Sequence, residues 1–140
     1  MDRLQWNKRY SEKDLLWKPS PHPVLEDISR QVSPGHALDL AAGEGRNALA
    51  LAQVGWKVTA VDFADVAVAR GEALADELGL SVDWHVADLT VYQPGQRQFD
   101  LVYLAFLHVP WQAMRTILKK AASAVCPGGM ILVIGHDRIN

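Results

Sequence analysis

DLAAGEGRNALALA, residues 39–52, places small residues and two glycines between an apolar segment and a segment with helical periodicity. Residues 36–41 predict a short buried strand, and residues 47–55 predict a helix that a glycine ends. A strand, a glycine-rich turn and a helix therefore follow one another directly, as they do in α/β proteins with parallel strands.

The glycine-rich turn has the properties of a ligand loop. Open α/β sheets bind ligands at the carboxyl ends of their strands, and glycines there let the backbone come close to the ligand. Gly43 and Gly45 can adopt conformations forbidden to other residues, and the small side chains of Ala41 and Ala42 leave room above the strand. We expect residues 41–47 to contact a ligand, although a plain tight connection would also use glycines.

The alternation of apolar strands and helices continues along the chain. Strands are predicted at residues 36–41, 56–63, 81–89, 99–106 and 130–135, and helices at 24–32, 47–55, 64–79 and 111–125. The strand at 99–106 is apolar on both faces, which predicts the middle of the sheet. The PGG at 127–129 predicts a turn into a last, buried strand. About five strands with right-handed crossovers predict an open, mostly parallel α/β sheet with helices on both faces.

The length of 140 residues predicts a single domain with a substantial core. Residues 1–35 predict an N-terminal helical cap and loop, in which Pro19, Pro21 and Pro23 interrupt any helix, and residues 36–140 predict the ligand-binding core. The chain stops almost directly after the last predicted strand. We therefore expect a C-terminally truncated domain with a bare sheet edge, through which the chain forms homo-oligomers or loses stability.

Composition restricts the class of protein. Hydrophobic residues make up 49% of the chain and charged residues 21%, as in a folded globular protein. The net charge of −2 does not indicate a basic surface of the kind that binds nucleic acid. A single cysteine cannot form an intrachain disulfide, and the N-terminus lacks the apolar segment of a secretory signal. No apolar run approaches the roughly 18 residues of a membrane span. We expect a soluble, cytoplasmic protein.

Two nucleotide cofactors are compatible with the loop. Gly43, Gly45 and Ala48 also fit the dinucleotide fingerprint GxGxxG/A, and Asp62 follows about 20 residues later. A carboxylate at that position accepts hydrogen bonds from ribose hydroxyls whichever nucleoside is bound. A nicotinamide-dependent oxidoreductase is therefore an alternative, which Asp39 inside the strand disfavours.

An ordered set of motifs resembles a known family. The run LDLAAGEGRNALALA resembles motif I of class I S-adenosylmethionine-dependent methyltransferases, VTAVDF is similar to their acidic motif, and VADL to their adenine-site motif. FDLVYLAFLH and PGGMILVIGH are similar to the last two core motifs. The resemblance covers residues 36–136 and implies a Rossmann-like fold, S-adenosylmethionine as cofactor and methyl transfer. WNKRY and GRN resemble the branch of tellurite-resistance methyltransferases, which implies a small-molecule acceptor.

The resemblance implies roles for individual residues. Asp62 would accept hydrogen bonds from the ribose hydroxyls, and Asp88 from the adenine amino group unless it only caps a turn. Phe63 would pack on the adenine or in the core. Asp39, which its context buries, either organises the loop amides, reaches the cofactor ammonium through water, or is a capped structural residue. The expected cofactor-binding residues are Asp39, Ala41, Gly43, Gly45, Asn47, Asp62, Phe63, Ala87, Asp88, Leu89, Ala105, Arg9 and Tyr10.

His108 is the candidate catalytic residue, because it lies where the fourth strand opens into the expected cleft. An imidazole there can act as a general base for a hydroxyl, thiol or amine acceptor, and the alternative is a structural histidine. His136 and Asp137 beyond the last strand are weaker candidates.

Trp6, Arg9 and Tyr10 share one face of a predicted N-terminal helix, so they either close over the cofactor or pack against the core. Cys126 is expected to be a small core residue. The scattered histidines and the lone cysteine predict no metal site.

The sequence thus predicts transfer of a methyl group from S-adenosylmethionine to a small molecule by in-line displacement. The protein would mainly align the reactants and exclude water. A cofactor-binding domain without catalytic activity is a further alternative, because part of the acceptor pocket would lie in the segments that the chain lacks.

Overall fold

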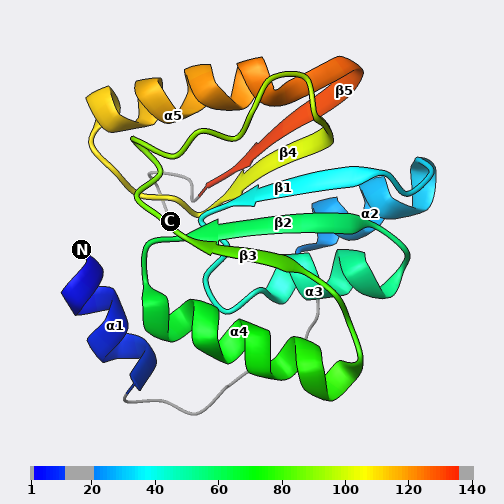
Figure 1. The fold of residues 1–140 in the computed structure, drawn as a ribbon. Helices are drawn as coiled ribbons and strands as arrows, with labels where there is room; N and C mark the ends of the chain where they lie inside the picture. Colours follow the sequence, from blue (N-terminus) through cyan, green and yellow to red (C-terminus); the bar gives the residue numbers. More distant parts are fainter. Residues whose placement is uncertain (1, 12–20, 136–140) are drawn as a thin grey trace.

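The computed structural model describes residues 2–11 and 21–135, and it forms one parallel sheet with helices on both faces (Figure 1). The helices are α1 (Arg3–Ser11), α2 (Pro23–Gln31), α3 (Arg46–Gln53), α4 (Asp65–Leu78) and α5 (Trp111–Ala124). The strands are β1 (His36–Leu40), β2 (Lys57–Asp62), β3 (Asp83–Val86), β4 (Phe99–Ala105) and β5 (Val125–Ile134). The predicted five-stranded, Rossmann-like α/β fold is confirmed.

The five strands lie in the order β3-β2-β1-β4-β5, and every neighbouring pair is parallel. The middle strand is therefore β1, and the prediction that residues 99–106 form the middle was wrong. β4 is apolar on both faces because it lies between β1 and β5, and an internal strand is covered on both sides wherever it stands in the order.

Two apolar clusters cover the two faces of the sheet. On one face, Leu25 of α2 and Leu51 of α3 pack with alternate residues of β1, β2 and β4. On the other face, Ile117 of α5 packs with the intervening strand residues, such as Leu38 and Val102. Figure 1 shows α5 alone above the sheet, and α2, α3 and α4 below it. The period-2 burial of the strands therefore directs one set of side chains to each layer.

The last strand differs from its prediction in two ways. β5 begins already at Val125, which pairs with Phe99, and the next pair is Leu101 with Met130. The PGG segment is thus an irregularity inside the strand, with Gly128 at φ 82°, rather than a turn before it. β5 is also an edge strand with exposed side chains, so the expectation of a buried strand was wrong.

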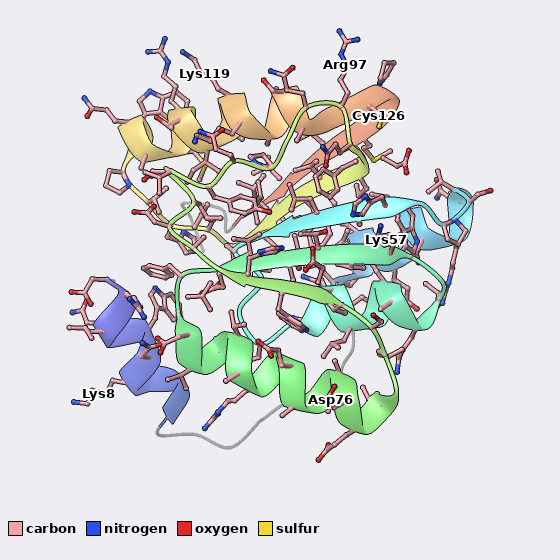
Figure 2. The ribbon with its side chains drawn as sticks, viewed as in Figure 1. Lys8, Lys57, Asp76, Arg97, Lys119 and Cys126 are labelled. Atoms are coloured by element: carbon pink, nitrogen blue, oxygen red, sulfur yellow. The ribbon has the colours of Figure 1, made fainter. Side chains whose placement is uncertain are left out.

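Cys126 lies at the start of β5, beside Arg97 (Figure 2). Its thiol is half-buried and donates to the Arg97 carbonyl at 3.0 Å. The expected core position is therefore wrong, because β5 carries this residue at the margin of the sheet.

Candidate functional site

A cavity of about 390 Å³ lies at the carboxyl end of the sheet, between the loops that follow β1, β2, β3 and β4. Trp6 of α1 adds a further wall. This is the position where open α/β sheets bind ligands. The cavity is lined by Trp6, Ala41, Ala42, Gly43, Glu44, Arg46, Asn47, Asp62, Phe63, Asp88, Leu89, Thr90, Ala105, Phe106, Leu107, His108, Val109 and Ile117.

The loop after β1 is held in a left-handed backbone conformation at three positions. Ala41 has φ 80°, Gly43 φ 58° and Gly45 φ 89°. The amides of Ala41 and Ala42 both donate to the carbonyl of Val61 at 2.9 Å, which ties the loop to β2. A left-handed alanine is uncommon and costs about 1 kcal/mol or more, so the surrounding hydrogen bonds must fix this turn.

Asp62, at the end of β2, connects the loop after β1 to the start of α4. Its Oδ2 accepts from the amide of Gly43 at 2.8 Å, and its Oδ1 accepts from the amide of Ala64 at 2.9 Å. Burial raises the pKa of the Asp62 carboxyl, and the amides of Ala64, Gly43 and Phe63 oppose that rise. A carboxylate offers about four lone-pair positions, so Asp62 keeps acceptor capacity for a ligand at the cavity beyond these amides.

Asp39 lies on β1 behind the loop and does not line the cavity. It is fully buried opposite Tyr103 of β4. Burial raises the pKa of Asp39 to about 7, the Tyr103 hydroxyl lowers it, and the charge of Asp62 raises it further. Burial and the neighbouring Asp39 likewise raise the pKa of Tyr103 well above its usual value. The carboxyl therefore lies behind the site.

The loop after β3 carries an aspartate turn. Oδ1 of Asp88 accepts from the Thr90 amide at 2.9 Å and from the Thr90 hydroxyl at 2.7 Å, while its carbonyl accepts from the amide of Tyr92. Asp88 thus adopts the turn geometry that was weighed against an adenine contact, and it also lines the cavity. The two roles are compatible, since only Oδ1 has bonds to the turn in this part of the chain.

The loop after β4 forms the opposite wall. Phe106 has φ 58°, and its amide donates to the carbonyl of Ile134 at 2.7 Å. The ring of His22, which precedes α2, lies 5.7 Å from the Phe106 ring, and the His22 amide donates to Oδ1 of Asn47 at 2.8 Å. These contacts join the segment before α2 to two cavity residues, Asn47 of α3 and Phe106 of the loop after β4.

Most of the predicted site residues meet at this cavity. Its lining includes Ala41, Gly43, Asn47, Asp62, Phe63, Asp88, Leu89, Ala105 and His108. Asp39, Gly45 and Ala87 are not part of the lining. Arg9 and Tyr10 belong to α1, but their side chains lie outside the described part of the structure, as do His136 and Asp137 altogether.

Within the ligand loop predicted at residues 41–47, sequence reasoning gave no individual role to Glu44 and Arg46. It missed five further lining residues: Thr90, Phe106, Leu107, Val109 and Ile117. Glu44 is buried, burial raises its pKa, and the charge of Arg70 opposes that rise. A glutamate between two glycines predicts a solvated loop residue, so its burial has no local sequence signal. The residues that follow β4 could have been found, because every strand end of such a sheet contributes to the cleft.

Within residues 2–11 and 21–135, no group of three or more histidine, cysteine, aspartate or glutamate side chains could hold a metal ion. None of the helices in these two segments is long and apolar enough to cross a membrane.

Comparison with known proteins identifies the domain. A family model described as a methyltransferase domain matches residues 37–129. The ubiquinone biosynthesis O-methyltransferase of Xanthomonas axonopodis pv. citri is 36% identical over 142 residues, which cover 93% of this chain and 57% of that protein. Its counterpart in Xylella fastidiosa is 34% identical and matches 98% of this chain and 63% of its own length. The chain spans 38% to 63% of the length of the first curated relatives it matches.

Solved structures show the same fold. A protein from a study of disulfide-to-thioacetal conversion in echinomycin biosynthesis has a TM-score of 0.82 at 24% identity, covering 94% of this chain and 60% of its own. DhpI in a complex with SAM and HEP has a TM-score of 0.72 at 28% identity, covering 96% and 64%. TehB from Haemophilus influenzae, at 22% identity and a TM-score of 0.77 over 91% and 44% of the two chains, shares the fold.

The matched family model, the ordered motifs and the glycine loop with its acidic partner at the end of β2 agree with one another. This chain therefore belongs to the methyltransferase domain family, and its core is that of a class I S-adenosylmethionine-dependent methyltransferase.

Proposed function

We propose that this chain binds S-adenosylmethionine in the cavity at the end of the sheet and supports methyl transfer to a small-molecule acceptor. The observation that carries this proposal is the Asp62 carboxylate, which lies at the cavity and holds the Gly43 amide of the glycine loop. A volume of about 390 Å³ with more than one aromatic wall suits a nucleoside with an amino-acid tail.

The residues at the cavity fit the two ends of such a cofactor. The lone pairs that Asp62 does not use for Gly43 and Ala64 would accept from ribose hydroxyls, and Phe63 beside it would pack on the adenine. Asp88, exposed at the cavity, would accept from the adenine amino group. The glycine loop would lie along the amino-acid tail, where small residues permit close approach. Arg9 and Tyr10 would add contacts from α1.

The bound cofactor would supply an electrophilic methyl group on a sulfonium. The chain would align the acceptor with that methyl group and exclude water. We propose that His108, at the same cavity, takes the proton of a neutral acceptor as a general base. An acceptor that is already an anion would need no base. Asp39 would act indirectly, through the backbone of the strand that precedes the loop.

The acceptor we propose is a small molecule, in line with the ubiquinone biosynthesis O-methyltransferases and the DhpI complex among the relatives. A net charge of −2 does not favour a nucleic-acid substrate. We also propose a cytoplasmic location, which the lone cysteine supports. The nicotinamide alternative is less well supported, because the matched family model describes methyltransferases.

Calorimetric titration tests the cofactor. We expect the chain to bind S-adenosylmethionine and S-adenosylhomocysteine and not NAD or NADH. Asp62→Asn keeps the shape of the side chain but removes half its acceptor capacity. The variant should therefore bind both sulfur nucleosides about tenfold or more weakly than the wild type does. The control is Asp76→Asn on the outer side of α4, away from the cavity loops (Figure 2). Selective binding of NAD would contradict the proposal.

The proposed base is tested separately, with labelled S-adenosylmethionine and a panel of phenols, thiols and amines. His108→Gln should lower kcat for a neutral phenol about 100-fold, as expected for loss of a general base, and leave KM for the cofactor unchanged. His85→Gln, on β3 and outside the cavity lining, is the control. Equal kcat in the His108 variant and the wild type would show that His108 only lines the cavity and is not a general base.

A further inference from the structure

Trp84 of β3 lies between α4 and the glycine loop. A Cβ atom built at Gly45 would overlap Cη2 of Trp84, and a Cβ atom built at Gly71 of α4 would overlap the same atom. The tip of the indole is therefore enclosed between two glycines that are 26 positions apart in the sequence. Neither glycine can be enlarged without moving the ring or the backbone that faces it.

The loop backbone also reaches α4 at this point. The Gly71 Cβ would lie 2.8 Å from Cζ3 of Trp84 and 2.9 Å from the carbonyl oxygen of Glu44. Gly71 is thus the position on α4 where the helix, the indole and the loop are all in contact. Glu44 immediately precedes Gly45, so the ring touches the segment that forms one wall of the cavity.

The indole is an unusual choice for this packing role. Its Nε1 is buried and has no hydrogen-bond partner among the described residues. A buried donor without a partner is unfavourable, and a phenylalanine or leucine would fill a plain core position without that penalty. What only the indole provides is length: its distal ring reaches from an outer strand to the glycine loop.

We propose that Trp84 is a positioning residue for the cofactor loop, and that Gly71 of α4 leaves the space that its indole occupies. The indole sets the distance between α4 and the loop, and thereby the place of the Glu44–Gly45 backbone at the cavity. Gly45, the second glycine of the loop, accordingly leaves room for the Trp84 ring rather than for the ligand. This explains why Gly45 does not line the cavity. This inference rests on the proposed cofactor.

The experiment compares four proteins: the wild type, Gly71→Ala, Trp84→Phe and the double variant. Each is titrated with S-adenosylhomocysteine and melted without ligand. Gly71→Ala pushes the ring toward the loop and should raise Kd about tenfold. Its melting temperature should fall, because the added Cβ overlaps the ring and the Glu44 carbonyl, and the higher helix propensity of alanine offsets only part of that cost. Trp84→Phe alone should weaken binding, because phenylalanine lacks the distal ring. In the double variant the Cβ added at position 71 fills the space that this ring leaves, so Kd should return to within about threefold of the wild type.

Gly79→Ala is the matched control. Gly79 ends the same helix at φ 68°, and a Cβ there meets nothing within 4 Å. This variant should lower the melting temperature through backbone strain and leave Kd unchanged. If Gly71→Ala does not fold, Trp84→Phe carries the test alone, with a weaker Kd expected at a melting temperature that stays above the assay temperature.

The outcomes separate the two proposals. A wild type that does not bind S-adenosylhomocysteine overturns the proposed function, and this inference with it. A wild type that binds, with an unchanged Kd in Gly71→Ala and in Trp84→Phe, overturns the positioning role and leaves the proposed function standing. A Kd that weakens in Gly71→Ala and is not restored by Trp84→Phe also overturns it, because the effect then does not pass through the ring.

Discussion

At the scale of single residues, burial disfavours the charged forms of one acid behind the cavity, Asp39, and of two acids that line it, Asp62 and Glu44. Burial raises the pKa of Asp39, Asp62 and Glu44, and Asp39 reaches about 7. Asp62 is compensated by backbone amides, and Glu44 by the charge of Arg70. Among the described residues, the Tyr103 hydroxyl is the group that favours the charged form of Asp39. With a pKa of about 7, Asp39 changes its ionisation near neutral pH.

Asp39 should make the chain less stable as pH rises. Its pKa is 3.8 in the ordinary state and about 7 in the folded chain, so the folded chain holds the proton more tightly. The contribution is complete below pH 4 and is lost as pH rises through 7, at about 1.4 kcal/mol per pH unit. Asp39→Asn should remove that slope, as measured by urea unfolding between pH 5 and 8. Parallel curves for the two proteins would contradict the raised pKa.

Individual site residues were predictable where one local feature identifies them. Asp62 follows the glycine loop at a fixed distance along a strand–helix–strand unit, so its position at the cavity follows from spacing alone. The burial of Glu44 was not predicted because it depends on contacts with α4, which local sequence does not encode. The left-handed conformation of Phe106 was missed because nothing in its side chain requires it.

At the scale of elements, α1 is held by the start of α4. Oδ1 of Asn7 accepts from the amide of Val66 at 3.2 Å, and its side-chain nitrogen donates to Asp65, which also pairs with Arg3. Ala64, the N-cap of α4, has no side chain able to cap that helix. Asn7 therefore supplies the missing cap from another helix, and this contact holds Trp6 at the cavity.

Asn7→Ala should release α1 from the body of the domain. Loss of a cap is worth about 1 kcal/mol, so exchange of the α1 amides should quicken about fivefold. S-adenosylhomocysteine should bind more weakly, because Trp6 would no longer be held at the cavity. Leu4→Ala is the control, since Leu4 is 77% exposed on the same helix. Hydrogen exchange by mass spectrometry gives the measurement, and equal exchange in all three proteins would contradict this role of Asn7.

Elements with strong periodicity were predicted within one to three residues. The helix expected at 64–79 is observed at Asp65–Leu78, and Gly79 ends it in the left-handed conformation. Pro127 and the two glycines that follow it led to a wrong prediction, because such residues indicate a turn in most contexts. Here the helix that precedes them joins β5 with no loop, so they lie within the pairing. That outcome depends on the partner strand, which local sequence cannot identify.

At the scale of the whole molecule, parallel pairing and the layers follow from the alternation of elements, but the order of strands does not. A run of apolar residues shows that a strand is internal, and both β1 and β4 satisfy that condition. What distinguishes them is a reversal in the order of the strands after β3. The next strand, β4, pairs with β1 on the side opposite β2 instead of continuing outward beyond β3. The same reversal opens the cavity between the loops after β1 and β4.

The reversal also leaves β5 as an edge. β5 pairs only with β4 in the described chain, and Met130, Ile131 and Val133 are between 41% and 54% exposed. A strand with unpaired backbone groups and exposed apolar side chains is a template for another strand. We therefore predict that this chain, purified alone, self-associates through β5.

Ile131→Lys combined with Val133→Lys should suppress that association, because charge on an edge strand opposes pairing with a second copy. The matched control is Val91→Lys, since Val91 is 68% exposed on the loop between β3 and β4. Sedimentation velocity over a concentration series measures the outcome. The wild type and the Val91 variant should shift to larger species with concentration, while the double variant stays monomeric. A wild type that sediments as a monomer at every concentration would refute the prediction, and association unchanged by the two lysines would place the contact on another surface.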